Sequence, residues 1–403
     1  MLVAFLWVWG ASSLGLVADD APSPLRLARQ SPESTGMPMG SLDAIHDIVA
    51  EGLANGKMPG AVVMVGHRGS IVFHKEYGLR SSLPEPRPML QNTVFDLASL
   101  TKPIATASCI MRLVQAGQIA LDDKVADHLP EFRSQGKQVV TIKQLLLHTG
   151  GLIPDNAMAD YQDGAEVARE RLLGLSLQYK PGTRFRYSDV GFQVLGELIE
   201  AKTGTSLADF AAKEIFDPLG MDETGYLPER PLRERAATTE QREGRWMEGE
   251  VHDPRAYAVG GVAGHAGLFS TANDLAIYSQ MMIEGGTLGD AKIFTQEIVD
   301  QMTKGYDVPG GSPDRPWERG LGWDKRTGYS SNRGESMTAS AFGHGGFTGT
   351  SLWIDPELEL FVIFLSNRVH PDGAGSVNAI AGAIGKVAAD AARAARVPSQ
   401  PDA

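Results

Sequence analysis

The 403-residue sequence is poor in cysteine, in basic charge and in long apolar runs, and each shortage excludes a class of protein. Cys109 is the only cysteine, so the chain forms no intrachain disulfide. Lysine and arginine number 37 against 49 acidic residues, and the net charge of −12 argues against a nucleic-acid partner and against an anionic membrane surface. Beyond residue 18 no segment is long and apolar enough to cross a bilayer, so we expect no membrane span in the mature chain.

Residues 1–18 are almost wholly apolar and end in small residues before Asp19 and Asp20. This stretch is too short for a comfortable membrane span and is typical of a signal peptide cleaved near Ala18, although it lacks a basic start. We therefore expect export to the periplasm or the medium, and a cytoplasmic protein if these residues are not a signal. Residues 19–38 contain several prolines and are predicted to be a linker.

Apolar periodicity predicts regular structure at both ends of the chain. Residues 41–54 have helical spacing, and residues 376–394 form an alanine-rich closing helix. Runs rich in β-branched residues, separated by turn residues, predict hairpins over 61–73 and 350–365. The middle of the chain shows mainly helical patterns. Residues 305–329, rich in glycine, proline, arginine and tryptophan, are predicted to be a loop.

The order of these elements predicts an α/β (α+β) fold. Hairpins rather than crossovers join the strands, so the sheet should be antiparallel and flanked by helices. Residues 39–97 and 320–395 would form this α/β domain together. Residues 98–319 would form a mainly helical domain with loops, inserted between the two halves.

A serine and a lysine three residues apart, Ser99 and Lys102, open an apolar segment. If a helix starts here, both side chains lie on one face, and Pro103 is tolerated because the first helical N–H groups have no intrahelical acceptor. Dry surroundings would lower the pKa of the lysine, which can then help to deprotonate the serine. The simpler interpretation is an N-cap serine beside a solvated lysine. A second Ser-x-x-Lys, at 134–137, lies in a polar stretch that we predict to be a surface loop.

Two further segments supply what acyl transfer by serine needs, a proton acceptor and an oxyanion hole. Tyr187 precedes an apolar helix, where a loop can aim it into a cleft, and a neighbouring ammonium would lower its pKa. The glycine-rich segment 343–350 leads into a strand, and its glycines leave room for substrate and for a backbone N–H aimed at an oxyanion. His344 in this segment can donate to the substrate. The competing interpretations are an ordinary half-buried tyrosine and a solvated histidine.

The three motifs, in this order, resemble those of the serine β-lactamase and penicillin-binding-protein superfamily. They are Ser99-x-x-Lys102, Tyr187-Ser188-Asp189 and His344-Gly345-Gly346. The nearest branch is that of class C β-lactamases, D-Ala-D-Ala carboxypeptidases and family VIII carboxylesterases. The segments 145–152, 260–271 and 366–367 also look like this branch.

This resemblance implies an antiparallel sheet flanked by helices beside an all-helical domain, with the site between them. It implies that Ser99 is the nucleophile, that Lys102 is its activating partner, and that Tyr187 is the base that also protonates the leaving group. The backbone N–H groups of Ser99 and Phe347 would form the oxyanion hole. Neither a metal nor an organic cofactor is implied.

Two positions depart from the pattern of this superfamily. Asp189 stands where asparagine is usual, and an ionised Asp189 would hold Lys102 protonated and leave Tyr187 as the base. His344 stands where lactamases usually have a lysine that holds the substrate carboxylate, and histidine is at most partly charged at neutral pH. These departures disfavour efficient β-lactam hydrolysis and favour an esterase or a cell-wall peptidase or amidase.

Three functions follow from this interpretation, all on a small-molecule ester, a β-lactam or a peptide. We place a carboxylesterase first. A D-Ala-D-Ala carboxypeptidase or muropeptide amidase comes second, and a β-lactamase or a penicillin-binding protein without turnover comes third. His252, Asp253 and His265 match no standard spacing of metal ligands, so we predict no metal site and expect them to shape the cleft or to satisfy loop backbone.

Overall fold

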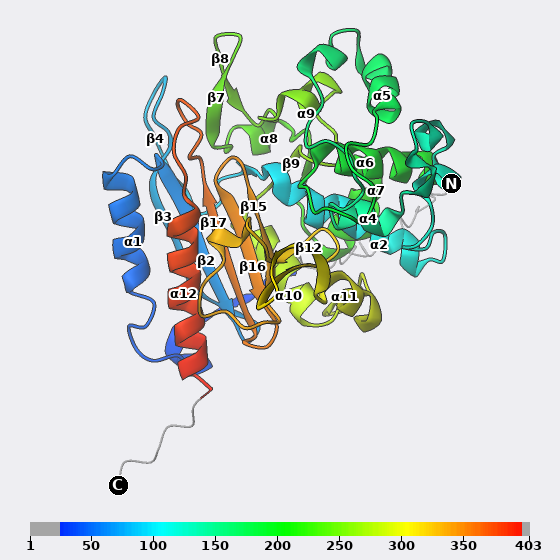
Figure 1. The fold of residues 1–403 in the computed structure, drawn as a ribbon. Helices are drawn as coiled ribbons and strands as arrows, with labels where there is room; N and C mark the ends of the chain where they lie inside the picture. The colour runs from blue at the N-terminus through cyan, green and yellow to red at the C-terminus, as the bar shows by residue number, and fades with distance from the viewer. Residues whose placement is uncertain (1–24, 397–403) are drawn as a thin grey trace, which may run out of the picture.

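The computed structural model describes residues 25–396, so the predicted signal peptide lies outside the described residues. Within this range a ten-stranded sheet forms the centre of the molecule (Figure 1), in the order β1-β3-β2-β17-β16-β15-β14-β13-β12, with β4 paired to β3. The strands of this sheet are β1 (Ala28–Arg29), β2 (Gly60–His67), β3 (Ser70–Ser81), β4 (Arg87–Pro88), β12 (Tyr306–Ser312), β13 (Arg315–Arg319), β14 (Asp324–Arg326), β15 (Phe342–Gly346), β16 (Thr350–Asp355) and β17 (Leu360–Ser366).

The sheet is antiparallel at every pairing except that of β1 with β3. The two predicted hairpins are present, as β2–β3 and β16–β17. They join each other through β2 and β17, where Val65 pairs with Val362. The prediction of an antiparallel sheet assembled from both ends of the chain is therefore confirmed.

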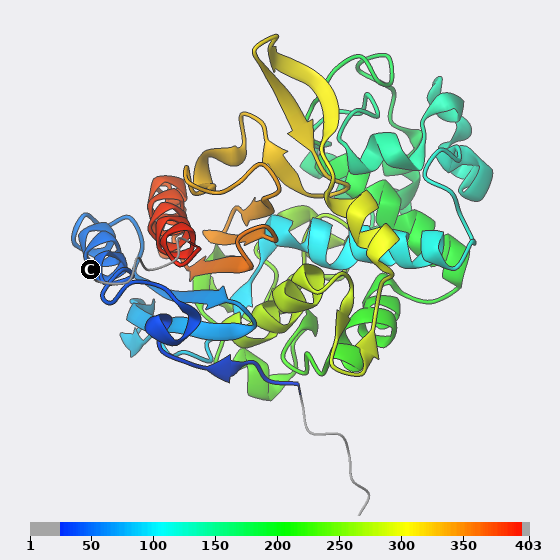
Figure 2. The ribbon, with the colours of Figure 1, turned by 90° about the horizontal axis from the view of Figure 1, so that it is seen from below.

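Side chains on the central strands alternate between two apolar layers. In β2, Val63 and Val65 pack on one side of the sheet, and Val62 and Met64 pack on the other. A strand points successive side chains to opposite faces, so a strand that is apolar throughout has to be covered on both faces. The helices α1 (Ala44–Ala54) and α12 (Asn378–Ala394) cover the first face, and α10 (Ala272–Ile283) lies against the second. Figure 2 shows α1 and α12 together on the side of the sheet away from the helical region.

The middle of the chain forms the helical region beside the sheet. Its remaining α-helices are α2 (Ser108–Gln115), α3 (Val125–His128), α4 (Ile142–Leu146), α5 (Ala165–Gly174), α6 (Asp189–Thr203), α7 (Leu207–Ala211), α8 (Arg230–Arg233), α9 (Pro254–Ala258) and α11 (Gln296–Thr303). Short strands also occur here: β5 (Phe95–Asp96), β6 (Gly225–Tyr226), β7 (Thr238–Arg242), β8 (Arg245–Glu248), β9 (Leu268–Ser270), β10 (Thr287–Leu288) and β11 (Ala291–Lys292). No helix among residues 25–396 is long and apolar enough to span a membrane.

The prediction of a loop over 305–329 is wrong, because this segment forms β12, β13 and β14 and extends the sheet. These strands lie at the edge of the sheet, β12 and β13 are largely exposed, and a bulge between Val308 and Gly311 interrupts their register. Edge strands tolerate proline, glycine and charge, so their sequence lacks apolar alternation. Part of the predicted linker is also ordered, since Ala28–Arg29 joins the sheet as β1. The division into two domains stays a prediction.

Candidate active site

The helix predicted at Ser99 exists, but it starts with unusual geometry. A 3-10 turn over Ala98–Leu100 is followed by a π-helical turn over Lys102–Ala107, which continues into α2. The ammonium of Lys102 lies 3.0 Å from the hydroxyl of Ser99. Every residue of the π-helical turn is buried, so the serine and lysine open an apolar helix as the sequence predicts.

Lys102 is fully buried and its ammonium has three acceptors. Besides the Ser99 hydroxyl, these are the carbonyl oxygen of His265 at 3.0 Å and the Oδ1 of Asp189 at 2.6 Å. Burial disfavours the charged amine, but the negative charge of Asp189 outweighs it, so the pKa of Lys102 is raised. The expectation that dry surroundings lower this pKa is wrong, and the alternative, a lysine held protonated by Asp189, describes the site.

Tyr187 lies directly before α6, whose first turn is capped by the side chain of Ser188. The ammonium of Lys102 is 5.0 Å from the centre of the Tyr187 ring, and Ser99 and Lys102 both act to lower the pKa of the Tyr187 hydroxyl. Burial raises the pKa of Tyr187 more than the charge of Lys102 lowers it. The predicted lowering of this pKa is therefore wrong, and the free protein holds a neutral phenol next to the serine.

His148 supports Tyr187 from behind, a role that the sequence did not reveal. The two rings stack with their centres 4.4 Å apart, and the Nδ1 of His148 accepts the backbone N–H of Ser188 at 3.1 Å. Burial, followed by the charge of Arg319, holds the pKa of His148 well below its usual range. A neutral His148 thus fixes the tyrosine segment from a loop that follows α4. The one sequence signal was its place in the family-like segment 145–152.

The strand β15 carries His344, Gly345 and Gly346 to the nucleophile turn. A Cβ on Gly346 would lie 2.3 Å from the carbonyl oxygen of Leu97, so only glycine allows this close approach. The hydroxyl of Thr350 donates to the same carbonyl at 3.0 Å. From the sequence we predict that these glycines leave room for the substrate. The structure shows that Gly346 makes room for the turn that holds Ser99.

His344 is buried and neutral. Burial, followed by the charges of Arg319 and Lys102, holds its pKa well below the usual range. Its Nδ1 lies 2.7 Å from the carbonyl oxygen of Gly345, and because a carbonyl only accepts, this nitrogen carries the proton. The Nε2 of His344 is consequently an acceptor. A histidine that donates to the substrate through Nε2, as the sequence suggested, does not fit this tautomer.

These residues meet at a cleft of about 400 Å³. The predicted residues that line it are Ser99, Tyr187, His344, Gly345, Gly346 and Phe347. Phe347 stands at its mouth with a side chain that is 59% exposed. Asp189 does not line the cleft, but it forms an ion pair with Lys102, which contacts Ser99. The structure therefore brings together every site residue that the sequence predicted, from segments up to 250 positions apart.

Arg319 is a further lining residue of the cleft that the sequence did not indicate. It lies on β13 and is fully buried, yet none of its guanidinium nitrogens has a hydrogen-bond partner among residues 25–396. Its nearest countercharge is the Oδ1 of Asp324, at 3.5 Å. The sequence does not reveal this role, because segment 305–329 has the composition of a loop, where an arginine is normally solvated. Tyr329, also on the cleft, stacks on Tyr187 with ring centres 5.1 Å apart.

Asp253, His265 and Asp189 place one potential metal-ligand atom each within 4.8 Å of one another. These atoms already have partners, since His265 contacts Asp253 at 2.9 Å and Asp189 contacts the ammonium of Lys102. Asp253 also accepts the backbone N–H groups that begin α9. The cluster thus neutralises and holds Lys102.

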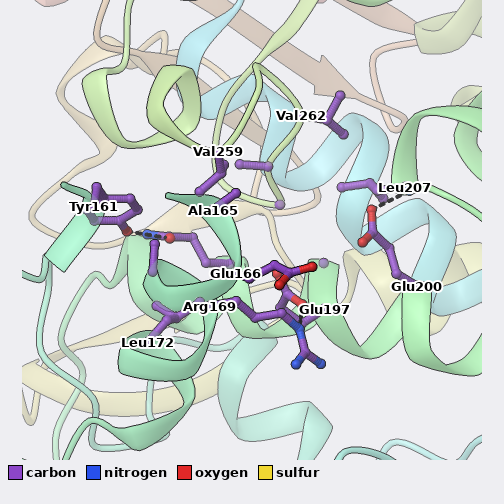
Figure 3. A pocket seen from close by; sticks show the side chains of 15 residues that line it. Tyr161, Ala165, Glu166, Arg169, Leu172, Glu197, Glu200, Leu207, Val259 and Val262 are labelled. Atoms are coloured by element: carbon purple, nitrogen blue, oxygen red, sulfur yellow. Dashed lines mark hydrogen bonds and ion pairs between the residues drawn. The ribbon is translucent and has the colours of Figure 1, made fainter. Parts of the chain in front are cut away.

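A second cavity, of about 280 Å³, lies beside α5 and α6 (Figure 3). Two of its acidic groups are paired: Arg169 forms an ion pair with Glu197, and Glu200 accepts the backbone N–H of Leu207. No serine, cysteine, lysine or histidine is among its lining residues. We therefore place the reactive site at the cleft of Ser99.

Comparison with known proteins agrees with this geometry. The chain is 32% identical over 367 residues to an N-acetylmuramyl-L-alanine amidase of Bacillus subtilis (strain 168), which covers 82% of this chain and 81% of that protein. It is 30% identical over 381 residues to a putative D-alanyl-D-alanine carboxypeptidase of Escherichia coli (strain K12), covering 85% and 86%.

The fold also matches a solved penicillin-binding protein homologue from Caulobacter crescentus, with a TM-score of 0.72, 22% identity, and coverage of 88% of this chain and 98% of that one. The family model described as Beta-lactamase matches residues 45–385. The chain belongs to the beta-lactamase family.

Proposed function

We propose that the protein is a serine hydrolase that cleaves an amide bond in an anionic cell-wall peptide through an acyl-enzyme on Ser99. The observation that carries this proposal is the cleft lined by Ser99 and Tyr187, with Lys102 beside Ser99, and by Arg319, whose guanidinium faces Asp324 at 3.5 Å but has no hydrogen bond. The names of two relatives, each at least 30% identical to this chain, support the substrate class.

In the proposed reaction, Tyr187 in its phenolate form takes the proton of Ser99 while the serine oxygen attacks the acyl carbon. The ammonium of Lys102 stabilises the phenolate, and the N–H groups of Ser99 and Phe347 hold the oxyanion. The phenol of Tyr187 then gives its proton to the leaving amine as the carbon–nitrogen bond breaks. Water attacks the acyl-enzyme by the same steps, and its proton returns Ser99 to the hydroxyl.

Arg319 supports an anionic substrate. A guanidinium without hydrogen bonds in a buried position is costly, and a carboxylate in the cleft would supply the missing acceptors in the paired geometry that arginine favours. The acceptor Nε2 of His344 would contact a substrate N–H or O–H beside it. The apolar residues 1–18 support export, which an extracellular cell-wall substrate requires.

A carboxylesterase is the second candidate, favoured by the neutral His344. His344 stands where lactamases usually have a charged lysine, and it carries no fixed charge. This position therefore does not favour a charged substrate over a neutral ester. β-Lactam turnover, or acylation by β-lactams without turnover, is expected to be weak for the same reason.

The test is a substrate panel on the purified protein: p-nitrophenyl butyrate, nitrocefin, a D-Ala-D-Ala peptide and a muropeptide that carries its N-acetylmuramyl–L-alanine bond. We expect the highest kcat/KM on one of the two cell-wall substrates, and loss of all turnover in Ser99→Ala. Turnover that persists in Ser99→Ala would reject the serine mechanism, whereas turnover of p-nitrophenyl butyrate alone would select the esterase.

A further inference from the structure

The residue directly before the nucleophile has a strained backbone. Ala98 has φ of +46°, in the left-handed region that residues with a Cβ rarely occupy. Ser99 follows in the same 3-10 turn, so the direction of its hydroxyl depends on this conformation. Strain of this kind persists only where surrounding contacts enforce it.

Asp96 supplies such a contact. Its side chain is buried, and its Oδ1 accepts the backbone N–H of Ala98 at 2.8 Å. A side-chain carboxyl oxygen that accepts a backbone N–H two residues ahead closes a local turn. The left-handed Ala98 is thereby held from within its own segment.

The same aspartate fixes two other segments of the site. Its Oδ2 accepts the backbone N–H of His252 at 2.6 Å, and its carbonyl oxygen accepts the hydroxyl of Thr348 at 2.7 Å. Thr348 follows Phe347, the proposed oxyanion donor. His252 precedes Asp253, which holds His265, and the carbonyl oxygen of His265 accepts the ammonium of Lys102.

We propose that Asp96 is a positioning residue that sets the orientation of Ser99 by holding Ala98 in its left-handed conformation, and that ties this turn to the loops of Phe347 and Lys102. The inference rests on the proposed role of Ser99 as nucleophile. It assigns Asp96 no contact with the substrate, so its loss lowers kcat and leaves KM nearly unchanged.

The test compares Asp96→Ala with Asp274→Ala. Asp274 is a matched control because it is also a buried aspartate that accepts a backbone N–H, that of Glu223 at 2.9 Å, outside the cleft. We expect Asp96→Ala to lower kcat about 100-fold, the usual result of displacing a reacting group by roughly 1 Å, with KM within about 3-fold. Asp274→Ala should lower the melting temperature and keep kcat.

A rescue variant separates orientation from general damage. Glycine adopts positive φ without the steric cost that alanine has, so adding Ala98→Gly to Asp96→Ala should restore kcat at least about 10-fold relative to Asp96→Ala. The recovery is read against Ala98→Gly alone. If Asp96→Ala does not fold, Asp96→Asn takes its place in both comparisons, because an amide keeps only one of the two acceptors.

Two results would overturn the inference: a kcat for the Asp96 variant equal to that of the Asp274 variant, or no recovery on adding Ala98→Gly. Failure of the proposed function is a separate result, since it shows as activity that survives Ser99→Ala in the otherwise unchanged protein.

Discussion

Replacing Asp189 by asparagine removes the charge that keeps Lys102 protonated, and two measurements should respond. In the native protein the ammonium and carboxylate are 2.6 Å apart, with Lys102 fully buried and the Asp189 side chain 21% exposed. At this distance and an effective dielectric constant of about 20, the attraction is roughly 6 kcal/mol before the cost of desolvating Lys102. Removing one partner of a buried pair costs about 3–5 kcal/mol, and we expect the lower end because asparagine keeps an oxygen beside the amine.

The pH range of this stabilisation follows from the raised pKa of Lys102. A lysine whose pKa is higher in the folded than in the unfolded chain stabilises the fold fully below the unfolded value of about 10.4, and loses this contribution as the pH rises through the folded value. Thermal melting at pH 7 therefore measures the whole effect. Asp390→Asn is the matched control, since Asp390 pairs with Lys386 at the same 2.6 Å but both are about half exposed, and such exposed pairs contribute little to stability.

The Asp189→Asn variant should be less stable than the native protein but more active at low pH. Without the carboxylate, burial lowers the pKa of Lys102, and a neutral amine 3.0 Å from the Ser99 hydroxyl can accept its proton. The kcat/KM of Asp189→Asn should therefore reach its plateau at lower pH than that of the native protein. A melting temperature lowered no more than in Asp390→Asn, together with superimposable pH profiles, would refute this account of the ion pair.

Three further predictions concern the cleft. Arg319→Gln should raise KM about 10–100-fold for a carboxylate-bearing peptide, because the substituted side chain no longer pairs with the carboxylate. KM for p-nitrophenyl butyrate is the control, and an equal change in KM for the two substrates would exclude an anion-binding role of Arg319. Because burial raises the pKa of Tyr187 above the ordinary tyrosine value of about 10, kcat/KM of the native protein should still be climbing at pH 10, and a plateau near pH 7 would contradict a tyrosine base. Gly346→Ala should cost about 1–3 kcal/mol of stability and most of the activity, because the added Cβ meets the Leu97 carbonyl. Gly174→Ala is the control and should be neutral, because its added Cβ has open space. Melting curves and turnover of both variants test this prediction.

The elements that depend on local sequence patterns could be predicted from the sequence. The hairpins β2–β3 and β16–β17, the closing helix and the Ser99–Lys102 spacing all depend on short-range patterns, and they were predicted. Prediction failed for properties that depend on contacts with residues far away in the sequence. The sign of the Tyr187 pKa shift depends on how deeply the ring is buried, and the edge strands that carry Arg319 have no apolar alternation to reveal them.

Three residues of the site, His148, Asp96 and Arg319, were not predicted because no motif marks them. His148 is recognisable only once its ring is seen against Tyr187, and Asp96 only once its two carboxyl oxygens are traced to the backbone N–H groups of Ala98 and His252. A single sequence contains the types of these residues but not the contacts that give them a role.

The pairing of β2 with β17 has a consequence for how the molecule is made. Val65 and Val362 are neighbours in the sheet although about 300 residues separate them, so this contact closes a very long loop. Such non-local pairings form late and slow folding. During synthesis the apolar edge of β2 stays unpaired until β17 is made, and β15, which carries the lining residues His344, Gly345 and Gly346, is made just before β17. A ribosome-bound chain that has not yet reached these strands therefore lacks part of the lining of the Ser99 cleft, and the candidate site is completed only when the sheet closes.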